Sequence, residues 1–215
     1  SIPDQISMVD TTIQHMDAGL DGPHMASFWV ARRLALMGNF IDDTLSGSSE
    51  HLMRIQWTQK SVVSNNTLSR VMYIKEMIAL RNLCESCYSH LGLTDAETSA
   101  TKHVVISDNH LESNSYTGIQ IDGNILSGLA GIKDVILERN WYDVQPGGGA
   151  PLTIRVNGIT IRNEIFNITN GKTSIVMGIR GANSIVNWGT NNLFAHNNTV
   201  VNTSGTGSVL FMYLS

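Results

Sequence analysis

The chain has 215 residues, of which 42% are hydrophobic and only 15% are charged, and its formal net charge is −4. This acidic balance gives no support for a nucleic-acid partner, because phosphate binding needs a basic surface. No apolar run approaches the roughly 18 residues that cross a bilayer, so we expect no membrane span. The many Asn, Val, Ile, Ser and Thr residues favour strands and tight turns over helices.

Short apolar strands recur along the chain, and each is followed by the same polar position, which we call the slot. In five of the six segments the slot is Asn, and in one it is Glu. The residues three and five before the slot and two after it are mostly apolar, which is the alternation of a strand with one buried face. In chain order the segments are 34–39, 62–66, 104–109, 135–140, 159–164 and 193–198, with slots at Asn39, Asn66, Asn109, Asn140, Glu164 and Asn198.

A second short strand follows each slot after a polar loop of variable length. These strands are expected at 52–56, 78–82, 118–123, 152–156, 176–181 and 209–214. One coil therefore consists of a strand, an Asn corner, a loop and a second strand. Such units bury their apolar faces by stacking, and their loops vary on one side. The slot side chains are then expected to form a ladder, with each amide hydrogen-bonded to the coils above and below.

This pattern predicts an all-β fold, a right-handed parallel β-helix of about six to seven coils in a single domain over residues 1–215. Residues 6–9 already resemble a strand, and 208–215 form an apolar strand without a polar cap. An open solenoid end exposes apolar surface and unpaired strand edges. We therefore expect the chain to be part of a longer β-helical protein, or its ends to be covered by another subunit.

Basic residues recur at a fixed distance from the slots. Three arginines lie fifteen residues after a slot and a fourth lies sixteen after, with Asp122 between them; the arginines are Arg54, Arg81, Arg155 and Arg180. Each follows an apolar residue, so each is expected to point outward from the coil. Arginine forks match carboxylates, which predicts a sheet face that binds an acidic sugar polymer. The alternative is a solvated face balanced by acidic loop residues, which contributes little energy.

Several motifs resemble bacterial right-handed parallel β-helix proteins of the pectate-lyase-like superfamily. They are the runs at 50–56, 60–66, 79–81, 105–109 and 135–140, together with Lys75. The resemblance covers nearly the whole chain at the level of the coil pattern. It implies a carbohydrate-active protein that is secreted, periplasmic or on the cell surface. Because lyases, hydrolases, epimerases and phage tailspikes share this fold, the resemblance is specific for the fold and weak for the activity.

Among these proteins, the chain is similar to the chondroitinase-B-like and alginate-lyase families, in which a Lys and an Arg on neighbouring coils act in β-elimination. A lyase of this kind neutralises a uronate carboxylate and supplies a base. The resemblance implies Lys75 and Arg81 as catalytic residues. It implies substrate contacts by His51, Arg54, Arg155 and Arg180.

Those families also hold Ca²⁺ through acidic side chains. Glu50 and Glu76 are available acids, but they do not match the family's calcium ligands residue by residue. No cofactor is therefore predicted, the metal stays unassigned, and Ca²⁺ is the ion to test.

Other functional interpretations of the chain depend on other residues. Paired carboxylates for glycoside hydrolysis would come from Asp42, Asp43, Asp108 or Asp122. Cys84 and Cys87 lack two further zinc ligands at a recognised spacing, so they are expected to be ordinary thiols or a local disulfide. Plain packing, with sugar stacking as the alternative, is expected of Trp57, Trp141 and Trp188. The rival to an enzyme is a non-catalytic β-helix, such as a tailspike, adhesin or surface protein that recognises glycans or acts as a spacer.

Overall fold

The structure is a computed structural model of the chain. It describes residues 4–14, 24–43, 51–70, 76–81, 101–113, 117–122, 132–144, 151–168, 177–179, 191–202 and 213–214. Every regular element in these residues is a β-strand. Within them, no helix is long and apolar enough to cross a membrane.

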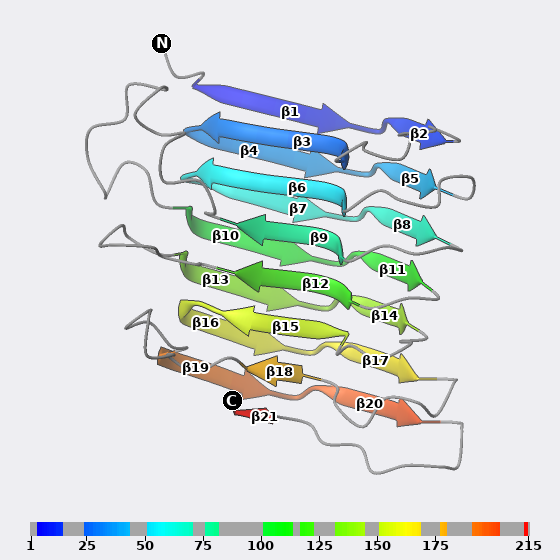
Figure 1. Cartoon of the computed structure of the whole chain (residues 1–215), viewed down its shortest axis with the longest axis vertical. Helices are drawn as coiled ribbons and strands as arrows, with labels where there is room; N and C mark the ends of the chain where they lie inside the picture. The colour runs from blue at the N-terminus through cyan, green and yellow to red at the C-terminus, as the bar shows by residue number, and fades with distance from the viewer. Residues whose placement is uncertain are drawn as a thin grey trace.

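The strands form three parallel sheets of seven strands each, and the chain visits the sheets in rotation (Figure 1). Sheet A contains β1 (Gln5–Val9), β4 (Arg33–Met37), β7 (Ser61–Ser64), β10 (Lys102–Ser107), β13 (Lys133–Glu138), β16 (Asn157–Arg162) and β19 (Asn191–His196). Sheet B contains β2 (Thr12–Gln14), β5 (Phe40–Asp43), β8 (Thr67–Arg70), β11 (His110–Ser113), β14 (Trp141–Val144), β17 (Ile165–Ile168) and β20 (Thr199–Asn202). Sheet C contains β3 (His24–Ala31), β6 (His51–Thr58), β9 (Glu76–Arg81), β12 (Thr117–Asp122), β15 (Leu152–Arg155), β18 (Met177–Ile179) and β21 (Tyr213–Leu214).

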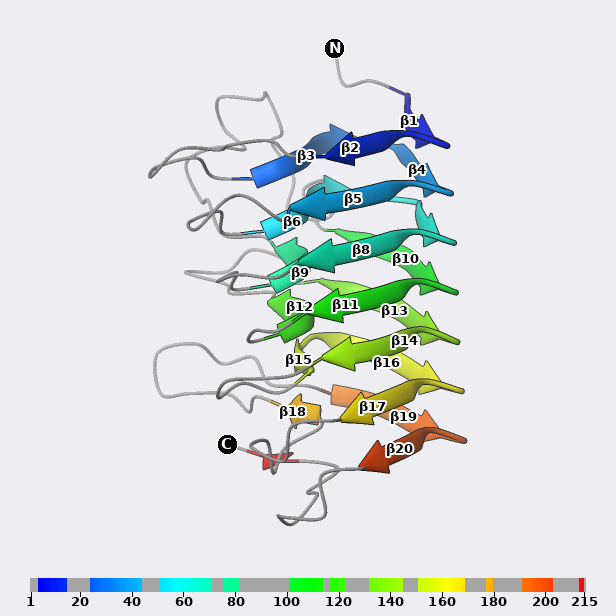
Figure 2. The same ribbon diagram turned by 90° about the vertical axis from the view of Figure 1, so that its right-hand side faces the viewer.

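This stack of parallel strands confirms the prediction of an all-β chain and agrees with a β-solenoid (Figure 2). The content of a coil differs from the prediction, because each turn of the chain contains three strands and not two. The apolar residue two positions after each slot belongs to a separate strand of sheet B. The expected strand and its continuation past the slot are thus divided between two sheets.

A left-handed residue directly before each slot makes this division. The backbone φ at these positions, and at Asp10 before Thr11 in the first coil, lies between 48° and 66°; the residues are Asp10, Gly38, Asn65, Asp108, Arg139, Asn163 and Asn197. Gly, Asn and Asp adopt this conformation more readily than other residues, and they fill six of the seven positions. One such residue turns the chain sharply, so that the alternation of apolar residues continues on the next sheet.

The core lies between the three sheets and is continuous along the stack. The inward side chains of sheet A, such as Leu36 and Ile106, are fully buried, as are Ile55 and Ile121 of sheet C. In sheet B, the rings of Tyr142 and Phe166 stack with their centroids 4.6 Å apart. Burial of each such side chain contributes about 1.5–3 kcal/mol, so the stacked coils stabilise one another.

The slot residues form the predicted ladder at the corner between sheets A and B. Asn66 Nδ2 donates to Asn109 Oδ1 at 2.9 Å, and Asn109 Nδ2 donates to Asn140 Oδ1 at 2.8 Å. Each of these amides also donates to a main-chain carbonyl of the preceding coil; Asn109 Nδ2, for example, lies 2.9 Å from the oxygen of Val63. The ladder therefore satisfies buried polar groups at the tight corner and fixes the register between coils.

Glu164 occupies one rung of this ladder and is fully buried. Its carboxylate accepts hydrogen bonds from Asn140 Nδ2 at 3.1 and 3.2 Å, and its own main-chain N–H donates to Asn198 Oδ1 at 2.9 Å. Burial raises the pKa of Glu164 to about 7, while the hydroxyl of Tyr142 and the amide groups of Asn140 offset part of this rise. The Tyr142 hydroxyl lies beside the carboxylate without forming a well-aligned hydrogen bond.

Candidate functional site

Sheet C carries most of the side chains for which the sequence predicts a function. His51 begins β6, Arg54 lies inside it, Arg81 ends β9 and Arg155 ends β15. The side chain of Arg54 is described; for the other three, only the backbone positions are. Lys75 and Arg180 lie outside the described residues, so the predicted catalytic pair is placed only through Arg81.

The strand register brings three of the predicted positions into one column. Asp122 pairs with Arg81 of β9 on one side and with Arg155 of β15 on the other. Neighbouring strands lie about 4.8 Å apart, so the two arginine positions are separated by roughly 10 Å along the stack. Two cationic positions thus flank one acidic position at the carboxyl ends of three successive strands.

Arg54 does not share this column, although its distance from the preceding slot equals that of Arg81. Arg54 pairs with Ala79, two residues before Arg81. His51, at the start of the same strand, pairs with Glu76. Arg54 and Arg81 therefore lie on neighbouring strands with a register offset of two residues, because the loops between sheets B and C differ in length between coils. Equal spacing from the slot is therefore not equal register.

The outward positions of β6 nevertheless form a polar surface with the column. Arg54 is partly buried, and Gln120 lies in its register row through Ala79 and is itself buried. Gln56, two residues after Arg54, is fully buried, and neither its amide oxygen nor its amide nitrogen has a hydrogen-bond partner among the described residues. An unsatisfied buried amide costs about 1–3 kcal/mol.

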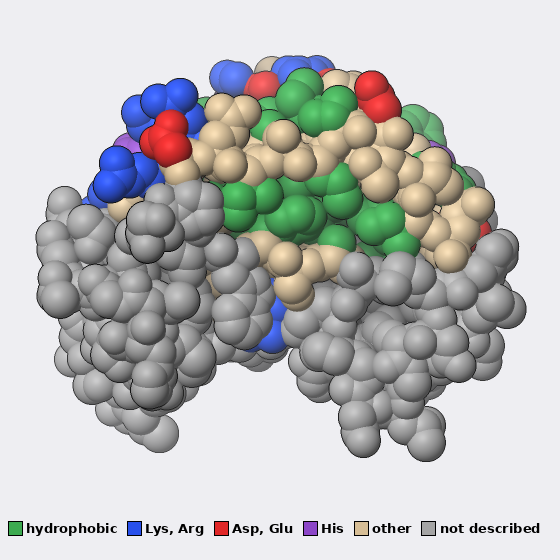
Figure 3. Space-filling model, turned by 90° about the horizontal axis from the view of Figure 1, so that it is seen from above, with side chains coloured by type: hydrophobic (Ala, Val, Ile, Leu, Met, Phe, Trp, Pro, Cys, Tyr) green, Lys and Arg blue, Asp and Glu red, His purple; other side chains and the backbone are tan. Residues whose placement is uncertain are grey.

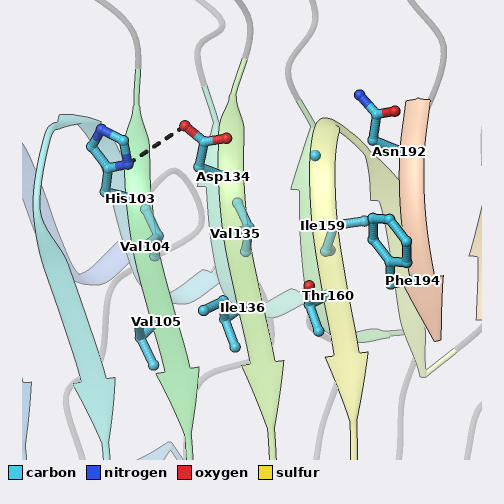
Figure 4. Close-up of a pocket in the computed structure, with 11 residues that line it drawn as sticks. His103, Val104, Val105, Asp134, Val135, Ile136, Ile159, Thr160, Asn192 and Phe194 are labelled. Carbon is cyan, nitrogen blue, oxygen red and sulfur yellow. Dashed lines mark ion pairs between the residues drawn. The ribbon is translucent and has the colours of Figure 1, made fainter. Parts of the chain in front are cut away.

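A groove on the outer face of sheet A was not expected from the sequence (Figure 4). It has a volume of about 480 Å³ and crosses β10, β13, β16 and β19. Its apolar part is formed by residues such as Val105 and Ile136, and its most exposed wall is Phe194, which is 64% exposed. At its upper rim in Figure 4, His103 Nδ1 lies 3.4 Å from Asp134 Oδ2.

The rim of this groove is a second column of left-handed residues. His103, Asp134, Gly158 and Asn192 occupy equivalent positions of four neighbouring strands, with φ between 52° and 78°. Gly158 leaves a gap between two polar side chains, and a Cβ placed there would lie 3.3 Å from Asp134 Oδ1. In the sequence, each of these four residues directly precedes the first inward-facing Val, Ile or Leu of its strand. This pattern is visible once the strands are aligned.

The carboxylates considered for hydrolysis do not form a described pair. Asp108 binds Arg139 through two hydrogen bonds of 2.7 and 2.8 Å, and this arginine lowers the pKa of the Asp108 carboxyl. Asp108 lies at the corner between sheets A and B, whereas Asp122 lies at the far end of sheet C. Asp42 is partly buried on β5, and the side chains of Asp43 and Asp122 are outside the described part.

Of the remaining candidate residues, some are described in the structure and others are not. Trp141 is 42% exposed on sheet B and meets His110 edge-on at 6.4 Å, so it lies away from both surfaces described above. Outside the described part lie Cys84, Cys87, Glu50, Trp188, and the side chains of Trp57 and Glu76. In the described ranges, no three His, Cys, Asp or Glu side chains are placed to share a metal ion.

Comparisons with protein-family models, with curated proteins and with solved structures found no match. Assignment of a function therefore depends on the two surfaces described here. Sheet C offers cationic positions at the ends of its strands, whereas the groove on sheet A offers an exposed ring beside short polar side chains.

Proposed function

We propose that the chain is a right-handed parallel β-helix of the pectate-lyase-like superfamily, with six to seven coils, and that sheet C binds an acidic polysaccharide outside the cytoplasm. The observation that carries the proposal is the column formed by Arg81, Asp122 and Arg155, with Arg54 on the neighbouring strand. A guanidinium group binds a carboxylate through two parallel hydrogen bonds, so each arginine position suits one uronate unit.

The direction of the column suits a polymer that runs along the stack. Its two arginine positions recur after two interstrand steps, roughly 10 Å, a distance comparable to that between alternate sugars of an extended chain. A single small anion would use only one arginine and would leave the rest of the column without a role.

We further propose that bound polymer is cleaved by β-elimination. Arg81 would neutralise the uronate carboxylate, which makes the proton on the adjacent carbon more acidic. Lys75 would accept that proton. The electron pair left behind forms a carbon–carbon double bond, the bond to the glycosidic oxygen breaks, and the departing oxygen takes up a proton. This step is supported by the resemblance to lyases and by the position of Arg81 at the end of β9.

The ultraviolet absorbance of unsaturated uronate products tests the proposal. The chain would be incubated with polygalacturonate, alginate and chondroitin sulfate, each with and without Ca²⁺. A rise in absorbance with one polymer, abolished in Lys75→Ala and Arg81→Ala, is the expected result. Arg162→Ala serves as a control, because Arg162 lies on sheet A and contacts Glu138 at 2.6 Å, away from sheet C. Full activity of both test variants on a polymer that the parent cleaves would refute the mechanism.

The groove on sheet A supports a second candidate, a non-catalytic protein that binds glycans. Phe194 offers an exposed ring for the apolar face of a sugar, and Asp134, Thr160 and Asn192 offer hydrogen-bonding groups beside it. This candidate predicts no unsaturated products. It predicts that neutral oligosaccharides from a glycan panel bind the parent and fail to bind Phe194→Ala, whereas Trp141→Ala on sheet B binds them as the parent does.

A further inference from the structure

Basic side chains line one edge of sheet A, where strands of sheet C end and strands of sheet A begin. We call this set, Arg32, Arg33, Lys60, Lys102 and Lys133, the basic ridge. Arg33 begins β4, and Lys102 and Lys133 begin β10 and β13 and pair with each other. Lys60 directly precedes β7, and its main-chain N–H donates to the oxygen of Arg32 at 3.1 Å. The ridge thus spans four consecutive strands in two adjacent register rows: Arg33 and Lys60 share the row of His103 and Asp134, whereas Lys102 and Lys133 lie one residue earlier.

The charge of the basic ridge contrasts with that of the whole chain. It holds five of the 14 Lys and Arg residues of a chain whose net charge is −4. Acidic residues at the same edge include Asp134, which binds His103, Asp4, which precedes the partner of Arg33 in β1, and Asp122, which ends β12. Viewed from the N-terminal end of the stack, Lys and Arg side chains gather at one corner with acidic atoms beside them (Figure 3).

The first three residues of the ridge are also available for binding. The side chains of Arg32, Arg33 and Lys60 are exposed, and no ion pair involves them within the described residues. Lys102 and Lys133 are partly buried and already interact with other groups. The outer part of the ridge therefore carries positive charge that the described protein does not neutralise.

The ridge lies at the same edge as the arginine column of sheet C. In Figure 1, β3 ends and β4 begins at this left-hand edge, and only Arg32 separates the two strands. The carboxyl ends of parallel strands meet at one edge of a sheet, so Arg81 and Arg155 end their strands at this edge too. Four strands span roughly 14 Å at about 4.8 Å per step. Charges repeated over that length fit a linear polyanion better than a single ion.

We propose that the basic ridge is a second contact surface for acidic polysaccharide, along which a long polymer lies after it leaves sheet C and crosses the edge. The polymer class rests on the proposed function, whereas the ridge itself is placed independently of any catalytic residue. The neighbouring groove supports a sugar polymer, because His103, Asp134 and Asn192 offer hydrogen bonds beside the charges. Such a surface would hold the polymer between successive cuts and strengthen the binding of long chains only.

The test compares long and short ligands in Arg33→Gln/Lys60→Gln. The ligands are polygalacturonate and its trisaccharide, titrated over a series of salt concentrations. We expect the variant to bind the polymer roughly tenfold more weakly at low salt, since it loses two exposed charge pairs. The dependence of the logarithm of affinity on the logarithm of salt concentration should become shallower by about 1.4 to 1.8, because two fewer contacts release counterions. Trisaccharide binding should match the parent, since a trisaccharide is held by sheet C alone.

A matched control changes the net charge by the same amount elsewhere. Gln14→Glu/Asn197→Asp alters two exposed side chains at the opposite end of the strands, and Asp accepts the left-handed backbone of position 197. This control should bind the polymer within twofold of the parent, because it changes the net charge of the protein and leaves the ridge intact. Equal thermal unfolding midpoints for parent, test and control variants show that folding is unaffected.

The outcomes separate this inference from the proposed function. Parent-like binding of polygalacturonate by the ridge variant, with weaker binding by Arg155→Gln, overturns the ridge and keeps sheet C. Weaker binding by the ridge variant alone supports the ridge and counts against sheet C. Tighter binding of duplex DNA than of polygalacturonate, lost in the ridge variant, overturns the assignment to polysaccharide. Absence of binding to either ligand by the parent overturns both proposals.

Discussion

Glu164 is the residue at which the ladder changes its chemistry. In the other rungs, the amide donates to the carbonyl three residues before the preceding slot, as Asn140 Nδ2 does to Ile106 at 2.9 Å. At Glu164 the corresponding carbonyl belongs to Leu137, and an ionised carboxylate has no proton to donate to it. The protonated form has one, and it also avoids a buried charge. Burial is accordingly the main reason that the pKa of this carboxyl rises to about 7.

This raised pKa makes the stability of the protein depend on pH. The native state binds the Glu164 proton more tightly than the unfolded state, so the stabilisation is complete below the ordinary pKa of 4.5 and is lost as the pH rises through about 7. The lost free energy of unfolding is on the order of 3 kcal/mol. Urea unfolding at pH 5 and pH 8 should show the parent to be more stable at pH 5 by an amount that Glu164→Gln largely removes. The exposed Glu112→Gln is the control and should retain the parental difference; if Glu164→Gln retains it too, the ladder is not its source.

At the scale of the element, the ladder predicts different costs for its inner and outer rungs. Asn109 is buried, and its amide both donates to Val63 and Asn140 and accepts from Asn66. Asn109→Ala leaves several buried groups unsatisfied and should lower the free energy of unfolding by about 3–5 kcal/mol. Asn198 is only partly buried, so Asn198→Ala should cost about 1–2 kcal/mol. Chemical denaturation of both variants gives the comparison, and equal costs would contradict the view that burial sets the strength of a rung.

The packing of sheet C against sheet B predicts a further effect at Gly118 of β12. A Cβ at this position would lie 2.9 Å from Cδ1 of Tyr142 and 3.1 Å from the main-chain oxygen of Pro151. Tyr142 is fully buried and stacked on Phe166, so it has little room to move away. Gly118→Ala should therefore lower the free energy of unfolding by about 1–3 kcal/mol. The double variant Gly118→Ala/Tyr142→Ala provides the check, because removal of the ring should make the added methyl group nearly neutral; a cost that persists would place the conflict at the carbonyl instead.

At the scale of the whole molecule, stability should be graded along the stack. Inward residues of the middle coils, such as Ile106 and Leu137, are fully buried, whereas Ile6 and Leu193 in the outer strands of sheet A are only partly buried. In a stacked array each coil is stabilised mainly by its neighbours. Amide hydrogen exchange should be slowest in β10 and β13 and at least tenfold faster in β1 and β19. Uniform exchange along the stack would show instead that the described coils unfold as one cooperative unit.

The sequence predicted the repeating part of the fold well and the surfaces less well. The slots at Asn66, Asn109 and Asn140 stood out because a buried amide at a fixed position satisfies the same main-chain groups in every coil. The third strand was missed because a single left-handed residue, such as Asp108, turns the chain without interrupting the apolar alternation. The offset of two residues between Arg54 and Arg81 could not be predicted, because register depends on loop length, and loops do not repeat.

The groove and the basic ridge were missed for a related reason. Each consists of residues on four different strands, such as His103 and Asp134 or Arg33 and Lys60, that are unremarkable when each strand is read alone. They become a site only when the strands are stacked in register. Binding surfaces of a solenoid run across its coils, perpendicular to the direction in which the sequence is read.

The ladder also gives the molecule an electrical polarity along its length. The amides of Asn39, Asn66, Asn109 and Asn140 each donate toward the next coil as well as to the preceding one, from Asn39 to Asn66 at 2.8 Å and onward to the Glu164 carboxylate. At the first coil Thr11 stands in place of an amide, and its main-chain N–H donates to Asn39 Oδ1 at 3.0 Å. Aligned hydrogen-bonded dipoles polarise one another. The row of amides therefore has a net dipole along the stack. Its two ends are not interchangeable, and each further coil can extend the row with the amides in one orientation only.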